Sequence, residues 1–181
     1  ELDPSAPAES DPGIAYADRL AKKYGSSREE AEHMIRRMTE TAARVGLELR
    51  FDRIRPGNTF DAHRVVHLAH DRGKQDEVKE RLFRGYLTEG APIGDRETVV
   101  RLAAEAGLDE EEVRATLLSD AYALDVREDE EEAEELGIRG VPFYIVGGRY
   151  ALAGAQPAET LLRTLTVAWE AVADPTDAPA H

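Results

Sequence analysis

Most of the chain repeats its apolar positions with the period of an α-helix, and each repeat is bounded by a capping residue or a glycine. In residues 14–24 the apolar side chains fall on one face, which predicts a short amphipathic helix that Gly25 ends. The same pattern predicts six more helices, at residues 27–45, 59–71, 75–87, 95–106, 109–118 and 122–136. The chain is therefore expected to be mainly helical up to Gly137.

Capping residues set several of these boundaries. Ser27 with a glutamate three residues later is a capping-box sequence, and Asp95 and Asp109 are favourable N-cap residues. Asn58 or the threonine after it caps the third helix. Residues 47–51 alternate apolar and polar positions, as a strand or an extended link does.

The hydrophobic pattern changes near the C-terminal end. Residues 143–146 suit a buried strand, and Gly147-Gly148 predicts a two-residue hairpin turn, because glycine adopts positive φ without a Cβ clash. A second strand and a helix at residues 157–172 follow. Since a proline interrupts hydrogen bonding inside a sheet, Pro142 is expected at the start of the first strand. From the residues alone, it either begins an edge strand or forms a cis peptide bond with Val141.

Composition narrows the class of protein. A chain of 181 residues with 41% hydrophobic content can bury the core of one compact domain, with room for an embedded subdomain. The net charge of −14 disfavours binding to a phosphate backbone, and the arginines are interspersed with glutamates. No apolar run is long enough for a membrane span. We therefore expect neither a nucleic-acid partner nor a membrane partner.

Several short motifs occur in the order found in one known family. Val141-Pro142-Phe143, Gly147-Gly148-Arg149-Tyr150 and Gly154-Ala155-Gln156 resemble the proline loop, hairpin and final-helix start of DsbA-like thioredoxin-fold oxidoreductases, especially of the FrnE-type branch. Asn58-Thr59-Phe60-Asp61-Ala62-His63-Arg64 resembles the motif that opens a helix of the family's inserted helical domain. Glu1-Leu2-Asp3-Pro4 resembles the end of its second strand. The resemblance covers nearly the whole chain.

This resemblance implies a fold class and a domain order. The fold is expected to be α/β: a thioredoxin-like fold with a large α-helical insertion, represented here mostly by helices with a C-terminal β-hairpin and a final helix. Residues 1–12 would be the end of the second core strand and a connector, and residues 13–137 the inserted helical domain. Residues 138–173 would be the C-terminal half of the core (β-β-α), and residues 174–181 a disordered tail.

The family's chemistry needs a Cys-x-x-Cys sequence at the start of its first helix, and this chain contains no cysteine. We interpret the chain as a fragment or truncated form whose catalytic portion lies N-terminal to Glu1, and we expect no catalytic residue within it. Alone, the hairpin would expose an apolar edge, so the fragment is expected to be marginally stable, to swap, or to form a homodimer.

The resemblance also implies site residues. Val141 would offer its backbone amide and carbonyl to an extended substrate, and a cis Pro142 would supply the bend that exposes them. Asn58, His63 and Arg64 are expected at a cleft between the insertion and the core. Their residue types are equally consistent with a helix cap for Asn58, packing within the insertion for His63 and a solvated surface position for Arg64.

Two further groups of polar residues stand out. His63, His67 and His70 share one helix face, a spacing that can bind a metal through two imidazoles, but no cysteine or acidic pattern completes a site. Residues 125–135 hold eight carboxylates, and a solvated helix face is the prediction for them. We therefore predict no metal and no cofactor.

Three functions follow from these observations. The first is a DsbA-like protein disulfide oxidoreductase, whose partner is a protein or small molecule that bears a thiol or disulfide, glutathione included. The second is an enzyme similar to glutathione-dependent 2-hydroxychromene-2-carboxylate isomerase, whose catalytic Ser or Cys would lie upstream of Glu1. The third is a non-catalytic helical binding module on the same scaffold. A cytoplasmic location is expected.

Overall fold

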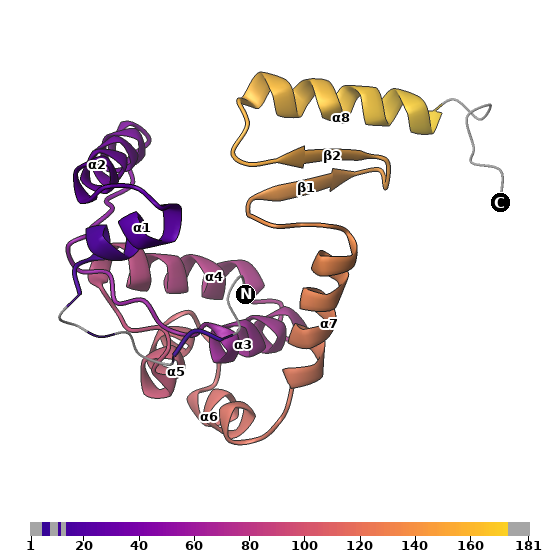
Figure 1. Cartoon of the computed structure of the whole chain (residues 1–181). Coiled ribbons are helices and arrows are strands. Elements are labelled where there is room, and N and C mark those ends of the chain that lie inside the picture. The colour runs from indigo at the N-terminus through magenta and orange to yellow at the C-terminus, as the bar shows by residue number, and fades with distance from the viewer. Residues whose placement is uncertain (1–4, 8–10, 12–13, 174–181) are drawn as a thin grey trace. The chain divides into compact units, whose positions relative to one another are not determined.

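The computed structural model describes residues 5–7, 11 and 14–173 (Figure 1). Those residues form eight α-helices, one π-helical turn and two strands. In chain order they are α1 (Tyr16–Tyr24), α2 (Arg28–Arg44), α3 (Phe60–Asp71), α4 (Gln75–Arg84), η1 (Gly85–Glu89), α5 (Arg96–Glu105), α6 (Glu110–Leu118), α7 (Ala123–Glu135), β1 (Phe143–Val146), β2 (Tyr150–Ala153) and α8 (Ala158–Ala173). The predicted strand end at residues 1–4 and the predicted tail at residues 174–181 lie outside the described residues.

The chain divides into two compact units between Asp129 and Glu130, inside α7. The first unit holds α1 to α6, η1 and the first half of α7. The second unit holds the rest of α7, the β-hairpin and α8. No helix among the described residues has both the length and the apolar character needed to cross a bilayer.

Side-chain caps begin the helices where the sequence predicts them. Ser27 Oγ accepts a hydrogen bond from the Glu30 amide at 3.2 Å, and the Glu30 carboxylate accepts one from the Ser27 amide at 2.8 Å. The hydrogen bond from the Ser27 amide lowers the pKa of Glu30. Asp95 accepts from the Thr98 amide at 2.9 Å, and Asp109 accepts from the third amide of its helix at 2.8 Å. Each carboxylate satisfies an amide that has no partner within its own helix.

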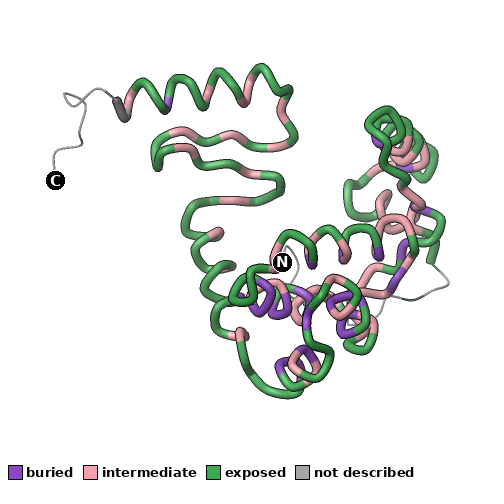
Figure 2. The backbone as a smooth tube through the Cα atoms, turned by 180° about the vertical axis from the view of Figure 1, so that it is seen from behind, coloured by how far each residue is buried: buried purple, intermediate pink, exposed green. Residues whose placement is uncertain are grey.

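The core of the first unit is built by α3, α4, α5 and α6. Its fully buried side chains come from all four helices: Val65, Leu68, Val78, Val99, Val100, Leu102 and Val113. Figure 2 shows that most buried positions fall in this part of the chain. Burial of these apolar side chains supplies the main free energy that holds the four helices together.

The fourth predicted helix changes its geometry before it ends. The sequence predicts a helix over residues 75–87, but α4 ends at Arg84 and a π-helical turn follows over Gly85–Glu89. A Cβ atom on Gly85 would lie 2.8 Å from Leu102 Cδ1, so glycine permits this turn to approach α5 closely. The wider turn ends at Gly90, whose φ of 73° is left-handed.

Residues 47–50 form an irregular link, and the strand considered for residues 47–51 is absent from this described segment. The Arg50 amide donates to the Leu87 carbonyl at 2.8 Å. Phe51 is buried, and its ring centroid lies 5.4 Å from that of Tyr16. The link is therefore fastened both to η1 and to α1.

In the second unit, β1 and β2 form an antiparallel pair with Val146 opposite Tyr150. Three residues, Gly147 to Arg149, therefore connect the strands, so the predicted two-residue turn is wrong by one residue. Gly147 and Gly148 have φ values of 62° and 68°, the left-handed region that the sequence predicts for this pair. The extra residue adds one position to the connection without changing the hairpin.

Helix α8 has one covered apolar side and one open one. Ala168 is buried, and its Cβ lies 3.8 Å from the position of a Cβ on Gly147. Leu162, Leu165 and Trp169 recur at helical spacing and are exposed by 66%, 53% and 77%. The second unit thus leaves apolar surface uncovered among the described residues.

Candidate functional site

The proline loop lies at the start of β1 in the second unit. The peptide bond between Val141 and Pro142 is cis. The Pro142 carbonyl accepts a hydrogen bond from the Gly154 amide at 2.8 Å, which fastens the loop to the residue after β2. This bond joins the loop to the hairpin within the second unit.

Val141 is an exposed residue of this loop. Its side chain is exposed, and neither its amide nor its carbonyl bonds to another described residue. The bond from Gly154 to Pro142 sets the phase of the antiparallel ladder. Because the pairing alternates, Phe143 and Ile145 direct their amides and carbonyls away from β2.

The outer edge of β1 is thus continuous with the loop. Within the described part of the chain the sheet has two strands, so this edge has no neighbour there. Backbone groups of Phe143 and Ile145 point outward along it, and those of Val141, just before the strand, have no bond to another described residue. An extended polypeptide can add to such an edge through main-chain hydrogen bonds.

Asn58 bonds both to the first amide of α3 and to the segment around Ala6 and Pro7. Its Oδ1 accepts from the Phe60 amide at 2.8 Å, and its Nδ2 donates to the Ala6 carbonyl at 3.2 Å. The Asn58 amide donates to the Pro7 carbonyl at 2.8 Å. The N-cap position of α3 is Thr59, which makes no side-chain cap bond, so Asn58 is not the N-cap, although its side chain satisfies the first amide of the helix.

Arg64 is buried, with 3% of its side chain exposed, so the solvated surface position considered for it is wrong. Its guanidinium donates to the carbonyls of Ala121 at 2.8 Å and Thr116 at 2.6 Å, and to that of Ser119. It also pairs with Asp61 at 2.8 Å. Arg64 therefore ties α3 to the loop between α6 and α7.

Two side chains of α3, those of His67 and Asp71, bond to residues at and near the start of α7. His67 Nε2 lies 2.9 Å from the Asp129 carboxylate, and its ring stacks on Tyr122 with centroids 6.3 Å apart. The Tyr122 hydroxyl donates to Asp71 at 2.7 Å, and this bond, with partial burial, raises the pKa of Tyr122. Tyr122 has a φ of 59°, unusual for a residue other than glycine.

The three histidines predicted on one face of α3 differ in their exposure and contacts. His63 and His70 are exposed, whereas His67 is half-buried and pairs with Asp129. The described residues contain no group of three or more possible ligands placed to hold a metal ion. The sequence predicts that Asp129 lies on a solvated helix face. The contact between Asp129 and His67 can be recognised only from the distance between them in the structure.

The predicted site residues fall in different units. Val141 and Pro142 belong to the second unit, and Asn58, His63 and Arg64 belong to the first. A cleft formed by the two sets stays a prediction. The geometry of the second unit by itself identifies the proline loop and the β1 edge as the candidate binding surface.

Comparison with known proteins assigns this arrangement to a family. The family description of a DSBA-like thioredoxin domain matches residues 2–166. The chain belongs to the DsbA-like thioredoxin family. Its fold class, a thioredoxin-like fold with a helical insertion, is thereby confirmed.

Two proteins illustrate the relationship. The crystal structure of a probable DsbA oxidoreductase from Streptomyces coelicolor, SCO1869, is similar with a TM-score of 0.86 and 41% sequence identity. The match covers 94% of this chain and 73% of that chain. The uncharacterised protein YwbO of Bacillus subtilis (strain 168) is 32% identical over 108 residues, which are 59% of this chain. The match spans about half, 54%, of the length of that curated relative.

Proposed function

We propose that this DsbA-like chain positions substrates for protein disulfide oxidoreduction, in the manner of the FrnE-type branch. The proposal depends on one observation. The backbone amide and carbonyl of Val141 bond to no other described residue, and Val141 lies next to the open edge of β1. Family membership supports the same reaction class. The substrate class is a polypeptide or small molecule that bears a thiol or a disulfide.

Thiol–disulfide exchange requires a thiolate that attacks a disulfide sulfur. One sulfur–sulfur bond forms as another breaks, and the departing sulfur takes the electron pair as a thiolate. In the reductive direction a second thiolate of the enzyme then attacks the mixed disulfide, so the substrate leaves with both of its sulfurs as thiols and the two enzyme sulfurs are left as a disulfide; oxidation of a substrate runs through the same steps in reverse. This chain has no cysteine, so in the proposal both enzyme thiols come from outside these 181 residues.

The contribution of this chain is orientation. A substrate segment that adds to the β1 edge would donate to and accept from the Val141 backbone, which holds its sulfur along one line of approach. Because the bound substrate is already oriented, the reacting sulfurs lose less orientational freedom when they reach the transition state. The exposed Val141 side chain would contact the residue beside the substrate sulfur.

Amide chemical shifts can test this mode of binding. The probe is an extended peptide with one cysteine held as a mixed disulfide with glutathione, titrated into the ¹⁵N-labelled chain. We expect the largest shifts at the outward-facing amides of Val141, Phe143 and Ile145, and smaller ones at Tyr144 and Val146, which face β2. Shifts without this alternation, or confined to the first unit, would contradict edge binding.

A pair of substitutions at one position separates the backbone from the side chain. Val141→Pro removes the amide hydrogen, whereas Val141→Ala keeps it and shortens the side chain. We expect Val141→Pro to weaken peptide binding by about tenfold or more, since a bound acceptor would lose its donor, and Val141→Ala to bind within about threefold of the parent. Gly154 shifts should stay at their parental values in both variants, which shows that the hairpin remains folded. Equal affinities for Val141→Pro and Val141→Ala would remove the backbone from the proposal.

Enzymatic activity gives an independent result. The 181-residue chain is expected to leave the rate of insulin reduction by dithiothreitol at its uncatalysed value, because the chain has no thiol. The assay follows turbidity as insulin chains separate and precipitate. Catalysis by the purified chain alone would overturn the assignment of both thiols to a region outside it.

A further inference from the structure

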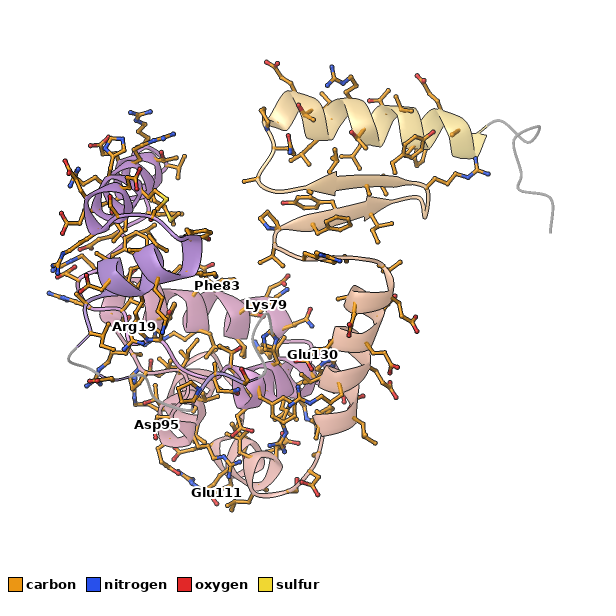
Figure 3. The ribbon with its side chains drawn as sticks, viewed as in Figure 1. Arg19, Lys79, Phe83, Asp95, Glu111 and Glu130 are labelled. Carbon is orange, nitrogen blue, oxygen red and sulfur yellow. The ribbon has the colours of Figure 1, made fainter. Side chains whose placement is uncertain are left out.

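The second half of α7 is unusually rich in negative charge. Residues 130–135 contain five glutamates and one alanine. Glu131, Glu132, Glu134 and Glu135 are exposed, and among the described residues they form no ion pair or hydrogen bond through their side chains. Figure 3 labels Glu130, the residue with which the second unit begins.

These charges oppose the helix that they belong to. Glu131 lies four residues before Glu135 and three before Glu134, and such pairs of like charge face each other on a helix surface. The last turn of α7 contains no basic residue. Negative charge at this end also interacts unfavourably with the helix dipole, whereas α1, α2 and α4 end with basic residues.

The first half of α7 makes side-chain contacts, whereas Glu131, Glu132, Glu134 and Glu135 make no ion pair or hydrogen bond through their side chains among the described residues. Val126 is buried, and the Arg127 guanidinium lies 4.2 Å from the centroid of the Phe60 ring. Asp129 pairs with His67 at 2.9 Å. These three contacts lie in the part of α7 that belongs to the first unit.

We propose that residues 130–135 form a charge-sensitive hinge, in which ionised glutamates favour an unwound segment and neutralisation favours the helix. Two backbone hydrogen bonds close the end of α7. The Gly137 amide donates to the Glu134 carbonyl at 2.9 Å, and the Ile138 amide donates to the Ala133 carbonyl at 2.8 Å. Unwinding breaks these bonds, which lie four and three residues before Val141. The segment that leads into the proline loop is thereby lengthened. The hinge operates whether or not the chain takes part in disulfide exchange.

Amide hydrogen exchange measured by mass spectrometry tests the hinge in the whole chain. The variant is E131Q/E134Q/E135Q, which removes three charges and keeps the side-chain size. Glu130 is left unchanged because it has an interaction of its own. After correction for intrinsic exchange rates, we expect protection of residues 130–138 to rise about three- to tenfold over the parent chain. Protection of residues 123–129 should change by less than about twofold, because that half is anchored by packing.

A matched variant separates helix position from net charge. E110Q/E111Q/E112Q removes the same number of charges from the first turn of α6, which Figure 3 marks by Glu111. There the dipole favours carboxylates, and Arg114 and Arg72 pair with them, so protection of α6 should fall. Raising salt from about 0.15 M to about 1 M should raise protection at residues 130–138 and lower it in α6, since screening removes repulsion and attraction alike.

Two results would overturn the hinge. One is an unchanged exchange rate at residues 130–138 in E131Q/E134Q/E135Q, with far-ultraviolet circular dichroism showing a folded chain. The other is a parent chain in which residues 130–138 are already as protected as residues 123–129. A rise in protection in both triple variants would assign the effect to net charge and would also exclude the hinge.

Discussion

An Arg64→Met variant is expected to lose about 3–5 kcal/mol of unfolding free energy relative to the parent chain, because it leaves buried acceptors without a donor. Arg64 is the shared donor to the carbonyls of Thr116, Ser119 and Ala121, and it pairs with Asp61. Methionine fills a similar volume but donates nothing, so the carbonyls lose these bonds and Asp61 loses its buried partner. Urea unfolding followed by circular dichroism measures the loss, and the melting temperature should fall by roughly 10 °C.

Arg96→Met is the matched control for this substitution. Arg96 pairs with the other oxygen of the same Asp61 carboxylate at 2.6 Å, but its side chain is 57% exposed. Because water replaces the lost partner, this variant should lose no more than about 1 kcal/mol. A loss for Arg64→Met that equals the loss for Arg96→Met would show that the buried hydrogen bonds contribute little. A selective loss would identify Arg64 as the residue that holds the α6–α7 loop on α3.

The structural role of Arg64 illustrates which features the sequence could predict. Helix starts depend on residues only a few positions apart, so Ser27, Asp95 and Asp109 could be recognised from their neighbours. The three carbonyls that accept hydrogen bonds from Arg64 lie 52 to 57 residues away along the chain. Nothing in its local pattern distinguishes an arginine that crosses to a distant loop from one that points into solvent.

Backbone departures from regular geometry were also beyond prediction. The apolar residues within 75–87 do not mark where α4 gives way to η1, because a π-helical turn differs from an α-helix in the spacing of its backbone hydrogen bonds, which the residue types do not signal. The left-handed backbone at Tyr122 has no glycine or asparagine to signal it. It is the tertiary contacts with Asp71 and His67 that accompany this conformation.

The candidate site was accessible to sequence reasoning for a different reason. Pro142 and the glycine pair that follows β1 constrain the backbone by their own chemistry, so a proline-led hairpin could be inferred before any contact was known. The direction of the free amides could not, since it depends on the phase of the β1–β2 ladder. The bond from Gly154 to Pro142 supplies that phase and assigns Phe143 and Ile145 to the open edge.

A Gly90→Ala variant is expected to lose about 3 kcal/mol or more of unfolding free energy, since two separate costs add at this position. Gly90 has a φ of 73°, a conformation that strains an L-amino acid. A Cβ atom there would also lie 2.6 Å from the Arg53 carbonyl oxygen and 2.8 Å from its Cβ. Neither of these Arg53 atoms can move without the backbone, so either the segment around Arg53 or the end of η1 must shift. Urea unfolding under the conditions used for Arg64→Met gives the value.

Gly46→Ala isolates the conformational part of this cost. Gly46 has a φ of 81°, but no atom lies within 4 Å of the position of its Cβ. Alanine there meets only the left-handed strain, so a loss of about 1–2 kcal/mol is expected. The difference between the unfolding free energies that the two variants lose measures the cost of the close approach between Gly90 and Arg53. If Gly90→Ala and Gly46→Ala lose the same free energy, the link yields to the methyl group and the contact at Gly90 does not constrain the fold.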